Sequence, residues 1–179
     1  NLCEALEIIT SDWGLRIGAR RITVSTSGLV PQIKMLAELP QQIRLAISLH
    51  GPNDETREKI MPVNKKFPVV DLFDALRIWN SKKNQKITLE YILIDGINAG
   101  IEHAQILATR ARSIRAKVNL IPYNTVEGLH WERPSDENCL RFKKVLTNAG
   151  VSATLRLEKG HDIDAACGQL RLKKEQGAV

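Results

Sequence analysis

Five short β-strand patterns, each separated from the next by a helical pattern, constrain the fold of this chain more than any other feature. The expected strands are residues 20–25, 43–49, 87–94, 118–122 and 151–157. The expected helices are residues 1–13, 31–39, 69–81, 101–114 and 135–148, with a helical turn over 53–61. Connections of this length favour parallel strands joined by helical crossovers. The pattern therefore predicts an α/β fold.

Within the strands, apolar residues alternate with small or polar ones. In the segment 43–50, Ile and Leu alternate with Arg44, Ala46, Ser48 and His50, and segments 22–25, 87–91 and 151–157 repeat the pattern. Strands buried on both faces usually read as continuous apolar runs, and an ordinary eight-stranded barrel is filled with branched apolar side chains. We therefore expect helices on the outer face and a polar ligand or water on the inner face, as in a partial, open barrel around a large cofactor. An antiparallel sheet with one solvated face is the alternative.

Polar residues gather where the expected strands end. Ligands of parallel α/β folds bind at the carboxyl ends of the strands, which here are residues 25–28, 48–50, 95–96, 123–124 and 156. Hydroxyl, imidazole and amide groups suit an amino-acid or ribose group, and Gly28 and Gly51 would let the backbone approach closely. A serine at a strand end is also a common helix cap, so the prediction depends on the shared rim. His50 could be a general base or a hydrogen-bonded rim residue, and without a second His or Cys at metal spacing we predict no metal site.

The chain carries a net charge of +6. Its basic residues form clusters at 65–66, 82–86, 110–117 and 171–174. Lys and Arg bind nucleic acids by neutralising phosphates, so RNA or DNA is one interpretation of the charge, and solvated helix faces with a charged tail are the other. There is no apolar run long enough for a membrane span and no signal-peptide pattern at Asn1.

The three cysteines, Cys3, Cys139 and Cys167, have no metal-motif spacing, and their odd number disfavours a disulfide framework. This usage predicts a reducing, cytoplasmic location. Cys167 lies in the segment 160–170 after the last expected strand, with small residues on both sides. It is either an accessible nucleophile or an ordinary free thiol on a tail.

Several stretches together resemble the RlmN/Cfr family of radical-SAM RNA methyltransferases, in the family's order and across essentially the whole chain. They are RITVSTSG (21–28), LAISLHGPND (45–54), PVNKK (62–66), NLIPYN (119–124) and DIDAACGQL (162–170). The last stretch is the most specific, and the match is closer to RlmN than to Cfr. The resemblance implies a partial (β/α) barrel of the radical-SAM type over residues 1–158, with its N-terminal strands missing. Residues 159–179 would form a loop and tail that carry the methyl-accepting cysteine.

The resemblance also implies the site and its chemistry. Contacts with the methionine and ribose portions of S-adenosylmethionine (SAM) are implied for Ser25, Ser48, Leu49, His50 and Asn124. Cys167 would be methylated by one SAM, and a second SAM would be cleaved reductively at a 4Fe-4S cluster served by an electron donor. The cofactors supply this chemistry and the protein positions it. The implied product is adenosine methylated at carbon 2, in large-subunit ribosomal RNA and, for RlmN, in certain tRNAs.

The chain also departs from the family's pattern. The cluster motif CxxxCxxC, the Gly-Glu-Pro stretch that contacts SAM and the second catalytic cysteine do not occur in it. We therefore expect these 179 residues alone to be unable to cleave SAM reductively. Two other hypotheses stay open: a non-catalytic SAM- or RNA-binding module derived from the family, and an unrelated α/β-barrel enzyme that uses His50 as a base.

Overall fold

A parallel sheet runs through the computed structural model, which describes residues 2–125 and 128–156. In this part of the chain the sheet has five strands in the order β1-β2-β3-β4-β5. The strands are β1 (Thr23–Thr26), β2 (Arg44–Ser48), β3 (Thr88–Leu93), β4 (Lys117–Pro122) and β5 (Ala153–Leu155). Every neighbouring pair is parallel. The α/β prediction is confirmed, and the antiparallel alternative is wrong.

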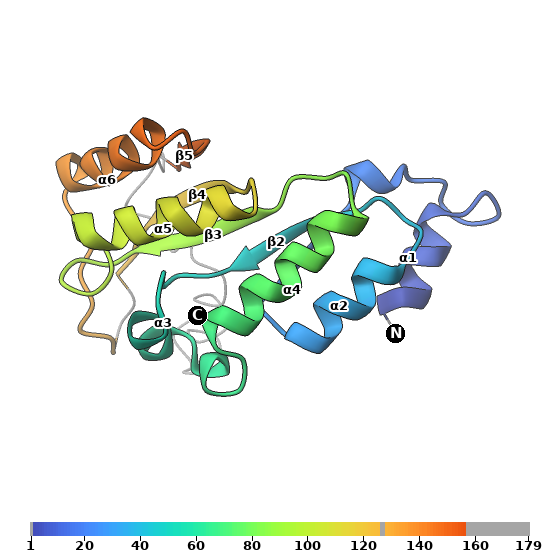
Figure 1. The fold of residues 1–179 in the computed structure, drawn as a ribbon, viewed down its shortest axis with the longest axis horizontal. Helices are drawn as coiled ribbons and strands as arrows, with labels where there is room; N and C mark the ends of the chain where they lie inside the picture. Colours follow the sequence, from blue (N-terminus) through green and yellow to red (C-terminus); the bar gives the residue numbers. More distant parts are fainter. Residues whose placement is uncertain (1, 126–127, 157–179) are drawn as a thin grey trace, which may run out of the picture.

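Helices connect the strands. They are α1 (Leu2–Thr10), α2 (Val30–Glu38), α3 (Asp54–Ile60), α4 (Val69–Lys82), α5 (Ile101–Ser113) and α6 (Asp136–Asn148), with 3₁₀ turns η1 (Ala19–Arg21) and η2 (Pro62–Lys65). Figure 1 shows α2, α4, α5 and α6 on one face of the sheet. The sheet and these helices form a partial barrel, consistent with the expected architecture.

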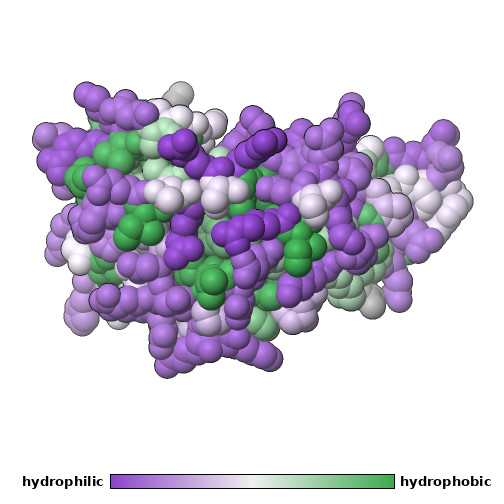
Figure 2. Space-filling model, viewed as in Figure 1, coloured by the Kyte–Doolittle hydropathy of each residue, from purple (hydrophilic) through white to green (hydrophobic). Residues whose placement is uncertain are grey.

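The core lies between the helices and one face of the sheet. Helix α4 shows the reason: Val69, Leu72, Phe73, Leu76 and Trp79 recur at the three- and four-residue spacing of one helical face, and all are at most 1% exposed. The apolar side chains of the strands pack against this helical face. They are fully buried and include Leu45 and Ile47 in β2 and Leu89, Tyr91 and Leu93 in β3. The outer surface of the helical layer is mainly hydrophilic (Figure 2).

The ends of the elements follow from local hydrogen bonds. The side chains of Asn53 and Ser135 cap α3 and α6 by accepting from backbone N–H groups three residues on. The first strand begins later than expected, because Arg21 N and Ile22 N donate to Gly18 O and Ala19 O and close a 3₁₀ turn.

Helices α5 and α6 end in the same way. Val151 N donates to Leu146 O and Ala116 N donates to Ala111 O, each at 2.9 Å. This hydrogen bond needs a left-handed residue just before the donor. After α6 that residue is Gly150 (φ +77°), whereas after α5 it is Arg115 (φ +50°).

A membrane-crossing helix, which would have to be long and apolar, is not found in the described part of the chain.

Candidate functional site

The sheet face opposite the core carries the polar half of the alternation. The strand register aligns these side chains into rows across the sheet: Ser25 pairs with Ala46 and Ala46 with Thr88, while Ser48 pairs with Glu90 and Glu90 with Asn119. Within the second row, Asn119 Nδ2 donates to Glu90 Oε2 at 2.7 Å. Ser48, Glu90 and Asn119 are half-buried. The expected polar inner face is therefore present, with hydrogen-bonding groups available on three adjacent strands.

Above this row, towards the carboxyl ends of the strands, lies a small apolar surface. Ile92 of β3 pairs with Ile121 of β4, and both side chains are half-buried. The face thus combines a polar centre with an apolar patch near the rim, a lining suited to a ligand with both kinds of surface.

His50 directly follows β2, and its backbone adopts the left-handed region with φ +56°. This turn brings the ring onto β3, where Ile92 N donates to His50 Nδ1 at 3.2 Å. A backbone N–H can only donate, so Nδ1 is the acceptor and Nε2 carries the proton of the neutral ring. Burial and, to a smaller extent, the charge of Arg57 lower the pKa of His50, while a hydrogen bond with the Glu90 backbone raises it, and the net result is a pKa of about 4. His50 is therefore a neutral hydrogen-bond donor through Nε2 near pH 7.

Arg57 of α3 holds the carboxyl ends of β1 and β2 together. Its side chain is fully buried. Nε donates to Leu49 O at 3.1 Å, Nη1 to Asn64 Oδ1 at 2.9 Å and Nη2 to Ser27 O at 2.5 Å. A buried cation without hydrogen-bond partners is costly. The carbonyls of Leu49 and Ser27 must therefore stay within reach of Arg57, which fixes the ends of β2 and β1.

Two glycines leave space for Arg57. A Cβ added to Gly51 would lie 2.4 Å from Arg57 N, and one added to Gly28 (φ +101°) would lie 2.9 Å from Arg57 Nη2. The backbone is thus closely approached at Gly28 and Gly51, while the approach to a ligand expected there stays a prediction. Within the described residues, the group that approaches is the protein's own Arg57.

Asn98 links the carboxyl ends of β2 and β3 through side-chain hydrogen bonds. It is fully buried, and its Oδ1 accepts from Ile94 N at 2.7 Å. Its Nδ2 donates to His50 O at 2.8 Å and to Ile92 O at 2.6 Å. These bonds secure the loop that carries the His50 ring.

The end of β4 supplies the last part of the rim. Asn124 is half-buried, and its Oδ1 accepts from Arg133 Nη1 at 3.3 Å. Beside it, the buried Tyr123 packs edge-on against Trp131, with ring centroids 5.9 Å apart. The Tyr123 hydroxyl has no hydrogen-bond partner among the described residues, which leaves a buried polar group at this edge unsatisfied.

The structure brings some of the expected site residues together and separates others. Ser25 and Ser48 lie on neighbouring strands, with Ser25 one row lower because its partner is Ala46. Asn124 follows β4, so β3 stands between it and His50, a lateral distance of roughly 10 Å at the usual strand spacing. The Leu49 side chain is fully buried in the core, so it faces the helices and only its backbone belongs to the rim. Cys167 lies outside the described residues.

Sequence reasoning missed four residues of this site. Glu90 and Asn119 were visible only as polar members of an alternating strand, and nothing in the sequence marked Arg57 or Asn98. Among the described residues, no group of three His, Cys, Asp or Glu side chains could hold a metal ion. Cys139 lies on the buried face of α6, and this burial raises the pKa of its thiol.

Comparison with known proteins gives a consistent result, although no protein-family model matches the chain. Over 176 residues the chain is 61% identical to a protein of Akkermansia muciniphila named "Probable dual-specificity RNA methyltransferase RlmN", covering 98% of the chain and 49% of that protein. It is 48% identical over 171 residues to a protein of the same name from Acholeplasma laidlawii, covering 96% of the chain and 51% of the relative.

Two solved structures share the fold. A radical SAM methyltransferase from Sphaerobacter thermophilus superposes with a TM-score of 0.87 at 43% identity, over 94% of this chain and 49% of that one. A domain of pyruvate-formate lyase-activating enzyme from Bacteroides vulgatus superposes with a TM-score of 0.64 at 20% identity, over 87% of this chain and 89% of that one, and shows likeness of fold alone.

Sequence and fold define the same class, that of the radical SAM methyltransferases. Within this class the chain is RlmN-like: nearly its whole length corresponds to the C-terminal half of proteins of that name. The resemblance read from the sequence is confirmed. The chain spans about half the length of the curated relatives that it matches.

Proposed function

We propose that this chain is the SAM-binding C-terminal portion of a radical SAM enzyme that methylates carbon 2 of an adenosine in RNA, with Cys167 as the methyl carrier. The observation that supports this most is the open polar sheet face, with its row Ser48, Glu90 and Asn119, in a chain 61% identical to a probable RNA methyltransferase. A face of this kind needs a polar occupant, and SAM is the ligand that the class provides.

The described residues fit SAM in their chemistry. SAM has a charged amino-acid end, a ribose with two hydroxyls and an apolar aromatic base. His50 Nε2 and the Ser48 hydroxyl offer donors, and Glu90 offers an acceptor held in place by Asn119. The half-buried pair Ile92 and Ile121 offers an apolar surface for the base. We assign Ser25, Ser48, the backbone of Leu49, His50 and Asn124 to the methionine and ribose portions.

The neutral state of His50 matters for this role. SAM carries a positive sulfonium group, and a second cation in the site would repel it. Because Ile92 N occupies Nδ1, the ring stays neutral and presents one directed donor. The Asn98 bonds fix the backbone of this loop before any ligand arrives, which removes part of the ordering cost of binding.

When bound, SAM supplies the methyl group, and its reductive cleavage at a 4Fe-4S cluster supplies the radical chemistry. The role proposed for the Cys167 thiolate is to take the methyl group onto its sulfur before the carbon is passed to adenosine. A cysteine sulfur suits this step because its thiolate is a strong nucleophile, whereas carbon 2 of adenine is not. The described residues do not fit the cluster, so its ligands and its electron donor are assigned to the remainder of the enzyme.

The RNA substrate is part of the same proposal. Both relatives are named dual-specificity RNA methyltransferases, and the chain has a net charge of +6. We propose adenosines of large-subunit ribosomal RNA and of tRNA as substrates, and the cytoplasm as the place of reaction.

Replacement of Cys167 tests the proposal directly. In the full-length natural protein, Cys167→Ala should abolish adenine methylation of RNA, and mass spectrometry should find an extra methyl group on the Cys167 peptide of the wild type. Cys139→Ala is the matched control, because the Cys139 side chain is buried on the inner face of α6. Methylation that survives Cys167→Ala would refute the assigned role.

The second candidate is a non-catalytic SAM- or RNA-binding module. The polar sheet face and the net charge of +6 would serve such a module as well. The same assay separates the two candidates: a wild-type protein that binds SAM and RNA without methylating the RNA would support the module.

A further inference from the structure

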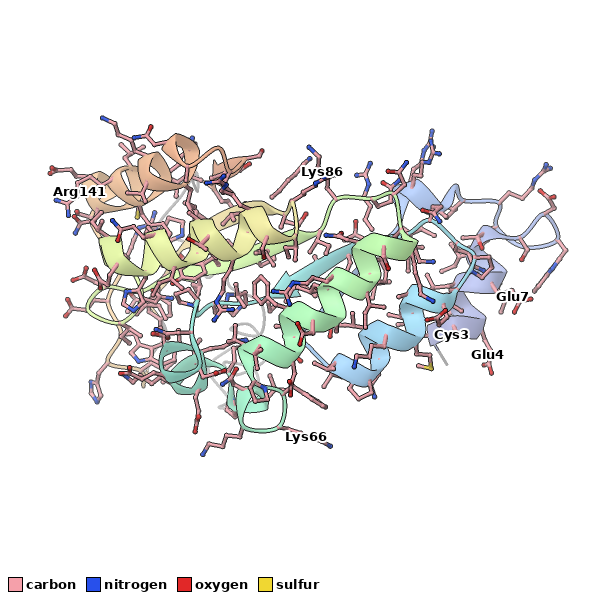
Figure 3. The ribbon with its side chains drawn as sticks, viewed as in Figure 1. Cys3, Glu4, Glu7, Lys66, Lys86 and Arg141 are labelled. Carbon is pink, nitrogen blue, oxygen red and sulfur yellow. The ribbon has the colours of Figure 1, made fainter. Side chains whose placement is uncertain are left out.

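A cavity of about 440 Å³ opens at the amino-terminal edge of the sheet, between the loops that follow α4 and α5. Ten residues line it: Arg77, Asn80, Ser81, Lys83, Asn84, Gln85, Lys86, Ser113, Ile114 and Arg115. Figure 3 shows Lys86 on the loop before β3, well away from Arg141 on α6. Because the strands are parallel, this edge is the one opposite the rim of His50 and Asn124. The cavity is therefore separate from the SAM site.

Positive charge dominates the cavity. Four of its lining residues are Lys or Arg, and none is Asp or Glu. Arg77 is held by Asp74, and Lys83 Nζ donates to the carbonyls of Leu39 and Gln41. Lys86 and Arg115 are exposed, and no ion pair is found for either of them within the described residues. These two cations are available for an external anion.

The carbonyl ends of α4 and α5 also lie at this edge, and free carbonyls would disfavour an anion. Several of these carbonyls already accept hydrogen bonds, which offsets part of their negative charge. Asn80 Nδ2 donates to Ile114 O at 2.5 Å, Lys83 N to Trp79 O at 2.8 Å and Ala116 N to Ala111 O at 2.9 Å. The basic side chains consequently determine the charge that the cavity prefers.

Further exposed basic residues lie near the cavity, at the amino-terminal edge of the sheet. Thr88 pairs with Lys117. Lys86 stands two residues before Thr88, and Arg115 stands two residues before Lys117. On β2, Arg44 stands two residues before Ala46, the partner of Thr88. Arg44 and Lys117 are exposed too. Arg44 on β2, Lys86 before β3 and Arg115 before β4 thus lie along the amino-terminal edge of three neighbouring strands, and we call them the basic row; the three strands span roughly 10 Å.

Arg115 occupies a position where stability alone favours glycine. It is left-handed at the end of α5, in the same hydrogen-bond pattern that ends α6 at Gly150. A side chain in this conformation costs about 1 kcal/mol relative to glycine. Strain that persists at an exposed position is a reason to look for a function of the side chain.

We propose that this cavity and its basic row bind the phosphate backbone of the RNA substrate, at the edge of the sheet remote from the SAM rim. The inference rests on the proposed function, which supplies RNA as the polyanion. Exposed cations along an edge of this length can neutralise several phosphates of one RNA strand. The contacts are to the backbone and carry no sequence preference.

The test measures RNA affinity of the full-length natural protein over a range of salt concentrations, with a substrate-derived RNA oligonucleotide as the probe. The variant Lys86→Gln/Arg115→Gln removes two phosphate contacts. It should reduce the slope of log K against log salt by about 1.4 to 1.8, and the affinity at 0.1 M salt by about 25- to 60-fold. The matched control is Lys34→Gln/Lys144→Gln, which removes the same charge from exposed positions on α2 and α6 and should leave the slope nearly unchanged.

Arg115→Gly separates a binding role from a structural one. This variant should raise the midpoint of urea unfolding while it weakens RNA binding, two opposite changes that a purely structural arginine would not produce. Equal salt slopes for Lys86→Gln/Arg115→Gln and the wild type would overturn the inference, even where the wild type methylates RNA normally. A wild type that neither binds nor methylates RNA would overturn the proposed function and this inference with it.

Discussion

The neutral His50 ring gives the sharpest physical prediction, because its pKa is displaced in one direction by two causes. Burial and the nearby charge of Arg57 lower the pKa from 6.5 to about 4. Protonation would also place an N–H at Nδ1, against the N–H of Ile92 that now donates to it. The folded protein therefore resists protonation in a pH range where the unfolded chain accepts a proton.

The sign of the effect follows from this difference. Between pH 6.5 and 4 the unfolded state binds more protons at His50, so the contribution of His50 to stability is complete above pH 6.5 and is lost as the pH falls towards 4. The full displacement corresponds to about 3 kcal/mol. Between pH 7 and 5, before most carboxylates titrate, the loss is about 2 kcal/mol.

Urea unfolding at pH 7 and pH 5 measures this loss. His50→Asn is the appropriate variant, because asparagine tolerates the left-handed backbone of this position better than most residues. On going from pH 7 to pH 5, the free energy of unfolding of this variant should fall by about 2 kcal/mol less than that of the wild type. His130→Asn, at an exposed position, should retain the wild-type dependence. An NMR titration that places the His50 pKa near 6.5 would refute the reasoning.

Three further substitutions test the supports of the rim, each measured by urea unfolding. Arg57→Met leaves three acceptors without their donor and should cost about 3 to 5 kcal/mol; a loss below 1 kcal/mol would contradict the role of Arg57 as the link between β1 and β2. Gly51→Ala forces a Cβ against Arg57 N and should destabilise by about 1 to 3 kcal/mol, whereas Gly18→Ala, which meets nothing within 4 Å, should be nearly neutral. Asn98→Ala should cost about 2 to 4 kcal/mol, since it leaves a buried N–H and two carbonyls unpaired; an unchanged midpoint would show that water replaces the amide.

The strands and the main helices could be predicted from the sequence because their periodicity is strong. The alternation in residues 43–50 correctly identified which side chains of β2 face the helices and which face away. Boundaries were less accurate where local hydrogen bonds compete with strand pairing, as at Arg20 and Arg21, which form a 3₁₀ turn in place of the start of β1.

The supports of the rim were not predictable for a physical reason. Arg57 stands in the sequence Asp-Glu-Thr-Arg-Glu-Lys, whose charges are typical of a solvated helix, and only the folded chain shows that this one side chain turns inward. Gly28 and Gly51 did indicate a close approach. Which group makes that approach depends on residues remote in the sequence, and periodicity carries no information about it.

The order of the strands has a consequence for how the sheet assembles. Among the strands of the described residues, each pairs with the one that precedes it in the chain, and none inserts between two earlier ones. The contacts are therefore local for a parallel sheet, which favours rapid folding, and each new strand and helix can dock on those already synthesised as the chain leaves the ribosome. The sheet grows at one edge like the stacked units of a repeat protein.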